Sequence, residues 1–175
     1  MQERFQLVYA IRDTRLGHLL VAATATGVCF VRFGDDPSEL RAALRDEFPF
    51  ADATEGHARA VRLSEALVDY VDGRSTRVDV PLDVRGSCFQ RRVWKELAAI
   101  PRGQTRSYGE VARAVGMPRG ARAVARACAR NPVPIAVPCH RVIDADGRVG
   151  GYNGGANRKL RLLADEGAVC LLRER

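Results

Sequence analysis

Short apolar runs separated by polar turns dominate the first half of the chain. Three of these runs are rich in β-branched and aromatic residues, a pattern that predicts an antiparallel meander. The runs cover residues 5–11, 19–24 and 28–33. Helical spacing of apolar residues then predicts amphipathic helices over residues 36–48 and 57–71. Residues 49–56 are expected to form a loop, and residues 78–84, which Pro81 interrupts, an edge strand or a linker.

The pattern becomes helical in the second half of the chain. Apolar residues at helical spacing predict a helix that begins at Cys88 and ends before Pro101. Ser107 and Glu110 are spaced as a capping box, so a second helix is expected to begin there and to end at a Gly-Met-Pro turn. A third, basic helix is expected over residues 119–130. Two helices joined by such a short turn are typical of a helix-turn-helix.

The third predicted helix has a distinct cationic side. Arg122, Arg126 and Arg130 recur every four residues, and Val124 and Cys128 lie about 200° around the helix from them. The remaining positions between these residues are all alanine, so the backbone can approach another surface closely. The helix contains no acidic residue, whereas a merely solvated charged face usually mixes acids with bases. The pattern therefore favours contact with DNA over the alternative of a solvated surface.

Charge is distributed unevenly along the chain. Residues 1–84 carry 10 basic and 14 acidic side chains, net −4, whereas residues 85–175 carry 18 and 7, net +11. The basic side chains are almost all arginine, which suits the recognition of phosphate. We therefore expect two domains, residues 1–84 and residues 85–175, of which the second binds a polyanion such as nucleic acid.

The candidate chemistry centres on the sequence Pro-Cys-His-Arg at residues 138–141. It follows the apolar run 135–137, which predicts a short strand that presents Cys139 at its end. A neutral thiol is a poor nucleophile and needs a base or a positive field, and His140 is its neighbour. Glu166, at the end of a final helix, supplies a carboxylate that could orient this histidine. The alternative interpretation is a buried cysteine beside a surface histidine.

The other cysteines and the last loop give weaker signals. Five cysteines with no Cys-x-x-Cys pair argue against a disulfide framework or a zinc ribbon, so no metal site is expected. The glycine-rich segment 144–155 lacks the Gly-Lys-Ser/Thr ending of a phosphate-binding loop. We interpret this segment as a wall of the pocket beside the reactive thiol.

Three stretches of the second half resemble the 6-O-alkylguanine-DNA alkyltransferase (methylated-DNA–protein-cysteine methyltransferase) family. They are FQRRVWKELAAIPRGQTRSYGEVARAVG, RAVARACARNPVPIAVPCHRVI and GGYNGGANRKLRLLADEG, and Pro-Cys-His-Arg is the methyl-acceptor signature of that family. The first half, with Gly-Asp-Asp at residues 34–36, resembles the repair half of the bacterial adaptive-response (Ada) proteins. The resemblance implies an α/β fold. A small ribonuclease-H-like N-terminal domain, with a three-stranded antiparallel sheet plus helices, precedes a mainly helical, winged-helix-like C-terminal domain with a helix-turn-helix.

The resemblance also implies the residues of the reaction. Cys139 is the methyl acceptor, and His140 is its base through a water molecule. Glu166 orients His140. Tyr108 donates a proton to the departing guanine and contacts a DNA phosphate.

The remaining implied roles concern DNA and the extruded base. Arg122 enters the base stack where the damaged nucleotide has left, and Asn131 buttresses the helix-turn-helix against the active site. Further DNA contacts are expected at Arg119, Arg126, Arg130, Ser107 and Ala121. The base pocket is expected to be lined by Val142, Val149, Tyr152, Asn153 and Gly154.

The implied function is DNA repair by irreversible, stoichiometric transfer of an alkyl group from 6-O-alkylguanine, and from 4-O-methylthymine, to Cys139 after base flipping. No cofactor is expected. The alternative is a helix-turn-helix protein that binds DNA or recognises damage without transfer. The expected partner is double-stranded DNA containing alkylated guanine. The sequence has neither a long apolar run nor a signal-peptide core. It therefore predicts a cytoplasmic protein that contacts no membrane. The resemblance implies a bacterial protein that associates with the nucleoid when bound to DNA and a monomer that can cluster on DNA.

Overall fold

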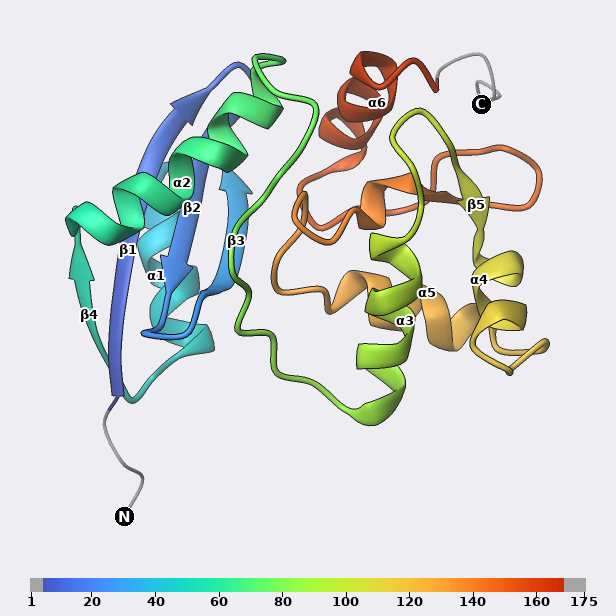
Figure 1. Cartoon of the computed structure of the whole chain (residues 1–175), viewed down its shortest axis with the longest axis horizontal. Helices are drawn as coiled ribbons and strands as arrows, with labels where there is room; N and C mark the ends of the chain where they lie inside the picture. Colours follow the sequence, from blue (N-terminus) through green and yellow to red (C-terminus); the bar gives the residue numbers. More distant parts are fainter. Residues whose placement is uncertain (1–4, 169–175) are drawn as a thin grey trace. The chain divides into compact units, whose positions relative to one another are not determined.

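The computed structural model describes residues 5–168, and the chain separates into two compact units, Met1–Val84 and Arg85–Arg175 (Figure 1). The first unit is a sheet with two helices, and the second is mainly helical. Among the described residues, no helix has the length and apolar character needed to cross a membrane.

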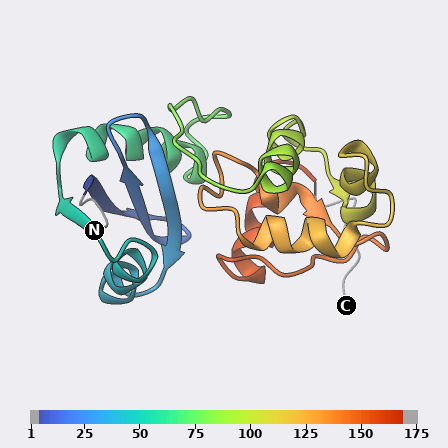
Figure 2. The same cartoon turned by 90° about the horizontal axis from the view of Figure 1, so that it is seen from below.

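The first unit is built on a four-stranded sheet. Its strands are β1 (Phe5–Thr14), β2 (Gly17–Ala23), β3 (Val28–Gly34) and β4 (Ala51–Glu55), in the order β3-β2-β1-β4. The first three strands form the antiparallel meander that the sequence predicts, whereas β4 pairs in parallel with β1. Helices α1 (Pro37–Glu47) and α2 (Ala58–Val71) lie on opposite faces of this sheet (Figure 2).

Local signals explain why α1 forms and how it packs. Asp36 caps the helix because its Oδ1 accepts a hydrogen bond from Ser38 N (2.7 Å), and Pro37 occupies the first helical position. Leu40 and Leu44 lie one turn apart and are buried in one cluster with side chains of the sheet. The sheet residues of that cluster are Leu7, Tyr9, Leu20, Ala22, Cys29 and Phe30.

One segment of the first unit differs from the sequence prediction, and a second matches one of the two alternatives. The expected loop at residues 49–56 contains β4, so the sheet has four strands and not three. Residues 51–55 are mostly exposed and lack large apolar side chains, so their sequence has no strand pattern. The strand exists because its backbone pairs with β1, a contact that the local sequence does not indicate. Residues 78–84 form no strand, so of the two predicted possibilities they are the linker. They are held by two backbone hydrogen bonds between Val28 and the segment, from Val28 N to Pro81 O and from Asp83 N to Val28 O, both 2.8 Å.

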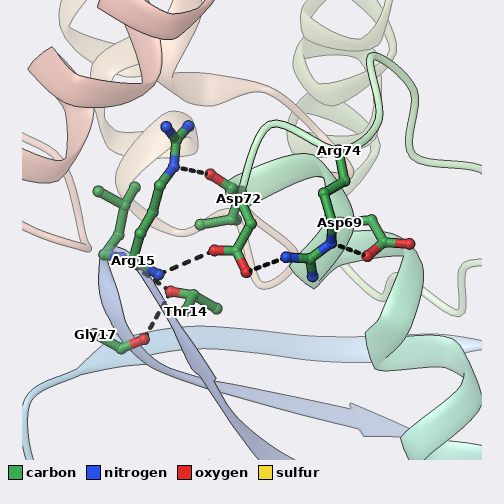
Figure 3. A network of polar contacts seen from close by, with 8 residues as sticks. Thr14, Arg15, Gly17, Asp69, Asp72 and Arg74 are labelled. Carbon is green, nitrogen blue, oxygen red and sulfur yellow. Dashed lines mark hydrogen bonds and ion pairs between the residues drawn. The ribbon is translucent and has the colours of Figure 1, made fainter.

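A polar network ties the β1–β2 turn to the end of α2 (Figure 3). Asp72, the C-cap residue of α2, accepts hydrogen bonds from Arg15 N (3.0 Å) and from Nη1 of Arg74 (2.9 Å). Arg15 also donates from Nε to the carbonyl of Val71, and Arg74 donates from Nε to Asp69 (2.8 Å). The arginine side chains therefore satisfy acceptors at the negative end of the helix.

The second unit contains short helices around a two-stranded parallel pairing. Its elements are α3 (Cys88–Ala98), β5 (Arg106–Ser107), α4 (Tyr108–Ala114), α5 (Ala121–Ala129), η1 (Cys139–Arg141), β6 (Val142–Ile143) and α6 (Ala156–Asp165). Strand β5 pairs with β6, which joins the start of α4 to the segment after η1. The predicted helix-turn-helix is formed by α4 and α5, and α5 is slightly shorter at both ends than the sequence predicts.

The helix-turn-helix is fixed by caps, a close turn and one buried hydrogen bond. Ser107 and Glu110 form the predicted capping box at the start of α4. Gly120 is the N-cap residue of α5, and a Cβ atom at this position would lie 2.9 Å from the carbonyl oxygen of Met117. Nε1 of Trp94 on α3 donates to Ala127 O (2.9 Å), which anchors α5 to α3.

Candidate active site

The sequence predicts a strand at residues 135–137, and the structure contradicts this prediction. Ile135 begins a tight turn with a φ of 77°, in the left-handed region that β-branched residues rarely adopt. The turn is closed by a hydrogen bond from Val137 N to Val133 O (2.9 Å). Prolines on both sides of this short run lack the N–H groups that a ladder needs, so the run folds on itself. Cys139 therefore opens the 3₁₀ turn η1 and does not end a strand.

Asn131 connects the end of α5 to this turn. Its Nδ2 donates to Val137 O (2.8 Å), and its Oδ1 accepts from Val133 N (3.1 Å). The side chain also hydrogen-bonds the thiol of Cys139, a contact that lowers the pKa of that thiol. Asn131 is buried, so these bonds form without competition from solvent. The residue thus links the end of α5 to the cysteine turn, and its role as a buttress of the helix-turn-helix stays a prediction.

His140, Arg141 and Glu166 form a buried charged cluster. Nε2 of His140 lies 2.6 Å from Oε1 of Glu166, and the imidazole is fully buried. Arg141 donates to the same carboxylate from Nε (2.8 Å) and Nη2 (3.2 Å), and from Nη1 to Ile100 O (2.6 Å). Because the ionised carboxylate only accepts hydrogen bonds, the proton of a neutral imidazole is placed on Nε2. Nδ1 is then the basic nitrogen.

The cysteine and the histidine are both held neutral at rest. Burial raises the pKa of the Cys139 thiol, and the hydrogen bond from Asn131 and the charge of Lys159 oppose this shift. Burial lowers the pKa of His140, although Glu166 favours its protonated form. A neutral imidazole near neutral pH is available to accept a proton.

The position of Nδ1 bears on the expected base role of His140. Within residues 5–168, this buried nitrogen makes no hydrogen bond. The structure brings Cys139 and His140 together in one turn, yet no direct hydrogen bond joins the thiol to the imidazole. The ring of His140 meets the ring of Tyr152 edge to face, with centroids 6.5 Å apart.

Cys139 lines a cavity with a volume of about 300 Å³. The other lining residues are Tyr108, Ala125, Cys128, Ala129, Gly151, Tyr152 and Asn153. Gly150 approaches the same region, since a Cβ atom there would lie 3.2 Å from the hydroxyl oxygen of Tyr108. The cavity thus joins the face of α5, the start of α4 and the glycine-rich segment around the thiol.

The structure brings some of the expected base-pocket residues to this cavity and not others. Tyr152 and Asn153 line it. Val142 and Gly154 are buried, and Val149 packs against the cluster of Ile143, Leu163 and Ala168. Val142, Val149 and Gly154 are therefore not among the residues that line the cavity. Which residues of the glycine-rich segment face the cavity and which face the interior could not be predicted from the sequence, because the segment forms no helix or strand with a regular spacing.

Lys159 and Cys128 are site residues that sequence reasoning missed. Lys159 is fully buried; its Nζ donates to Val142 O (2.6 Å) and lies 6.0 Å from the centroid of the Tyr108 ring. Burial lowers the pKa of this lysine, and its charge lowers the pKa of both Cys139 and Cys128. A lysine on an amphipathic helix is ordinarily solvated, so its burial could not be predicted from spacing. Cys128 is buried as predicted, but its side of α5 also faces the cavity.

The arginines expected to bind DNA lie on the exposed side of the helix-turn-helix. Arg122 and Arg126 on α5, Arg130 at its C-cap and Arg119 before it are exposed. Within the part of the chain that the structure describes, none of these four pairs with a carboxylate. Arg126 and Arg130 border a second hollow of about 420 Å³, and Arg122 does not. The hollow is completed by Ser87, Phe89, Gln90, Ala123 and Ala127. Ser107 serves as a helix cap, and Ala121 is the half-buried first residue of α5.

Acidification is expected to destabilise the protein through His140. Because the folded-state pKa lies below the unfolded value, the unfolded chain binds more protons as the pH falls through that value, about 6.5. The stability contributed by the neutral imidazole is complete above this pH and is lost below it, at up to about 1.4 kcal/mol per pH unit. Urea unfolding at several pH values between 7.5 and 5 measures the slope. His140→Gln should flatten it, because the variant has no imidazole to protonate at this site. Equal slopes for wild type and His140→Gln would contradict the assignment.

Fold and site together define a class of protein in which a helix-turn-helix adjoins a buried, cavity-lining cysteine. Two family models match the chain. The 6-O-methylguanine DNA methyltransferase ribonuclease-like domain matches residues 7–84, and the DNA binding domain of the same family matches residues 88–168. The chain belongs to the 6-O-methylguanine DNA methyltransferase family. The mixed α/β fold class expected from the sequence is confirmed.

Individual relatives support this membership. The chain is 40% identical over 164 residues to the bifunctional transcriptional activator/DNA repair enzyme Ada of Escherichia coli K12, covering 94% of this chain and 46% of that protein. It is 38% identical to a methylated-DNA–protein-cysteine methyltransferase of Methanosarcina acetivorans, covering 93% of this chain and 99% of that protein. The crystal structure of Mycobacterium tuberculosis OGT in complex with DNA matches with a TM-score of 0.76 and 40% identity, over 92% of this chain and 93% of that one. The chain thus spans less than half of the Escherichia coli protein.

Proposed function

We propose that this protein repairs DNA by transferring a methyl or other alkyl group from the O6 atom of guanine to its own Cys139. The observation that carries the proposal is the cavity in which Cys139 lies with Tyr108 and the inner side of α5, next in sequence to the buried His140–Glu166 pair. The names of the relatives from Escherichia coli and Methanosarcina acetivorans, a DNA repair enzyme and a cysteine methyltransferase, support the same activity. We extend the proposal to 4-O-methylthymine as a second substrate.

The proposed reaction is a displacement at the alkyl carbon. A bond forms between Sγ of Cys139 and that carbon while the bond from the carbon to O6 breaks. The bonding electrons leave with guanine, which takes up a proton. The thiol proton passes to Nδ1 of His140 through a water molecule, since Nδ1 is the nitrogen that Glu166 leaves available. The thioether product has no easy leaving group, so each protein molecule acts once.

The electrostatics of the site suit a thiol that is activated only when the substrate is in place. Burial raises the pKa of Cys139 and lowers that of His140, so the resting pair is uncharged. The charge of Lys159 favours the thiolate as it forms. Proton transfer to His140 and displacement at carbon are therefore expected to proceed together.

Tyr108 is proposed to assist the leaving guanine. Burial raises the pKa of its hydroxyl, so the group stays protonated as a hydrogen-bond donor. Its hydroxyl lies at the close approach of Gly150, on the wall formed by the glycine-rich segment. Tyr152 and Asn153 are proposed to contact the guanine directly, whereas Val142, Val149 and Gly154 support them from the interior.

The proposed partner is double-stranded DNA, bound through α5. The exposed arginines of α5 would contact phosphates, and Arg122 would fill the gap left by the extruded nucleotide. Extrusion costs a few kcal/mol, which a side chain in the stack helps to offset. We infer two functional domains, 1–84 and 85–175, of which the second carries the chemistry, and a monomer that acts on chromosomal DNA in the cytoplasm.

Mapping the modified residue tests the function. After incubation with a duplex that contains 6-O-methylguanine, peptide mass spectrometry should find a methyl group on Cys139 and on no other cysteine. The matched control is the same duplex with unmodified guanine, which should leave the protein unchanged. A methyl group on Cys88 or Cys128 would contradict the acceptor assignment. A protein that binds the duplex and leaves Cys139 unmodified would support the alternative, damage recognition without transfer.

A further inference from the structure

Cys128 is a second thiol in the acceptor cavity, and the proposed transfer gives it no role. Cys128 and Cys139 both line the cavity of about 300 Å³. Both residues are largely buried, with exposed fractions of 8% and 5%, and the cavity is the space that both of them line. The other described cysteines are placed differently, since Cys29 is buried in the first unit and Cys88 is exposed at the start of α3.

Hydrogen bonds through Asn131 link the backbones of the two cysteine residues that line the cavity. Asn131 N donates to Cys128 O (3.1 Å). The side chain of the same residue donates to Val137 O (2.8 Å), which also accepts from Cys139 N (2.8 Å). The charge of the Cys139 thiolate is felt at Cys128, since burial and this charge together raise the pKa of Cys128 to about 12. Lys159 lowers the pKa of both thiols and so favours whichever one ionises.

We propose that Cys128 is a resolving thiol that forms a reversible disulfide with Cys139 when an oxidant of the peroxide class enters the cavity. The thiolate of Cys139 attacks one oxygen of hydrogen peroxide, the O–O bond breaks, and a sulfenic acid and one water form. The thiolate of Cys128 then attacks the sulfur of Cys139, the S–O bond breaks, and a second water leaves with the released proton. The two thiols lose two electrons in total, and one peroxide is reduced to two waters.

The disulfide would protect the acceptor cysteine from irreversible oxidation. This benefit matters because each acceptor is used only once, so it rests on the proposed function. A sulfinic acid on Cys139 would remove a protein molecule irreversibly before it meets damaged DNA. A disulfide also blocks transfer, but a thiol reductant reverses it. Once Cys139 is a sulfenic acid it no longer competes with Cys128 for the positive charge of Lys159, which favours ionisation of the resolving thiol.

Peptide mapping tests the disulfide without any DNA. The full chain is treated with hydrogen peroxide, its remaining thiols are blocked with iodoacetamide, and it is digested with trypsin under non-reducing conditions. Cleavage after Arg126, Arg130 and Arg141 places the two cysteines on separate peptides, residues 127–130 and 131–141. A linked pair of these peptides that disappears on reduction is expected. Its absence, or a link from Cys139 to Cys88, would overturn the proposal.

Recovery of activity gives the second measurement. Transfer from free 6-O-benzylguanine is measured before oxidation, after oxidation and after reduction, each value relative to the untreated protein of the same variant. Wild type and Cys88→Ser should recover at least about fivefold more of their activity than Cys128→Ala, in which Cys139 is oxidised further. Equal recovery in wild type and Cys128→Ala would contradict the resolving role. An untreated wild type without transfer would contradict the proposed function instead, and the linked peptide would still decide the disulfide.

Discussion

Replacing Glu166 with glutamine is expected to lower the free energy of unfolding by about 3 kcal/mol and to slow alkyl transfer at least about tenfold. Glu166 is the buried carboxylate that accepts from Nε2 of His140 (2.6 Å) and from Nε of Arg141 (2.8 Å). The neutral amide would leave the guanidinium of Arg141 buried without its counter-charge. The amide also keeps only one acceptor oxygen, for which Nε2 of His140 and the guanidinium of Arg141 would compete, so the proton of His140 would no longer be fixed on Nε2.

The same substitution at a surface pair is the matched control. Glu96 forms an ion pair with Nη1 of Arg106 at 3.4 Å, and both side chains are partly exposed. Glu96→Gln should change the free energy of unfolding by less than about 1 kcal/mol and leave transfer unaffected. Urea unfolding gives the stabilities, and single-turnover transfer at a temperature where both variants are folded gives the rates. A Glu166→Gln variant that matches Glu96→Gln in both measurements would refute the positioning role.

Replacing Arg122 with alanine is expected to slow repair of methylguanine in duplex DNA by about 10- to 100-fold. The side chain is exposed on α5 and pairs with no carboxylate among residues 5–168, so it is available to enter the base stack. Its loss would leave the few kcal/mol of unstacking uncompensated. Transfer from free 6-O-benzylguanine, which involves no extrusion, should change by less than about twofold.

Tyr108→Phe provides the contrasting variant for Arg122→Ala. Because its hydroxyl is proposed to assist the purine as it leaves, its removal should slow transfer from both substrates, by about 10²-fold, at the low end for general acid catalysis. Single-turnover rates of the two variants on the two substrates separate base extrusion from chemistry. If Arg122→Ala slows both substrates equally, the arginine is structural and does not support the extruded base.

Elements with local signals were predictable, and those that depend on distant partners were not. The capping box of Ser107 and Glu110 and the cap at Asp36 lie within one helical turn of the residues they cap, so the sequence alone locates α4 and α1. Strand β4 has no such signal, because its backbone pairing with β1 joins segments 46 positions apart. The run 135–137 has strand-like side chains, but the prolines around it prevent a ladder.

The candidate site divides in the same way. The sequence identifies Cys139 and His140 because they are adjacent, and Glu166 because it ends a helix, and the structure brings His140 and Glu166 into contact. Burial of Lys159 depends on how α6 packs, and the shared cavity of Cys128 and Cys139 depends on how α5 meets the cysteine turn. No local pattern encodes either arrangement. The catalytic and DNA-binding roles inferred from the family resemblance stay predictions that the variants above would test.

The backbone at Ile135 has a consequence for sequence variation in this family. A left-handed conformation costs a residue other than glycine roughly 1–2 kcal/mol, and a β-branched residue lies at the unfavourable end of that range. Full burial of an isoleucine side chain contributes about 1.5–3 kcal/mol, and Ile135 is almost fully buried. A glycine at this position would relieve the strain but would leave a cavity, and replacing a buried isoleucine by a much smaller residue costs about 2–5 kcal/mol. Burial of the side chain therefore outweighs the strain, so a large apolar residue is favoured in the turn that carries the cysteine despite its unfavourable backbone conformation.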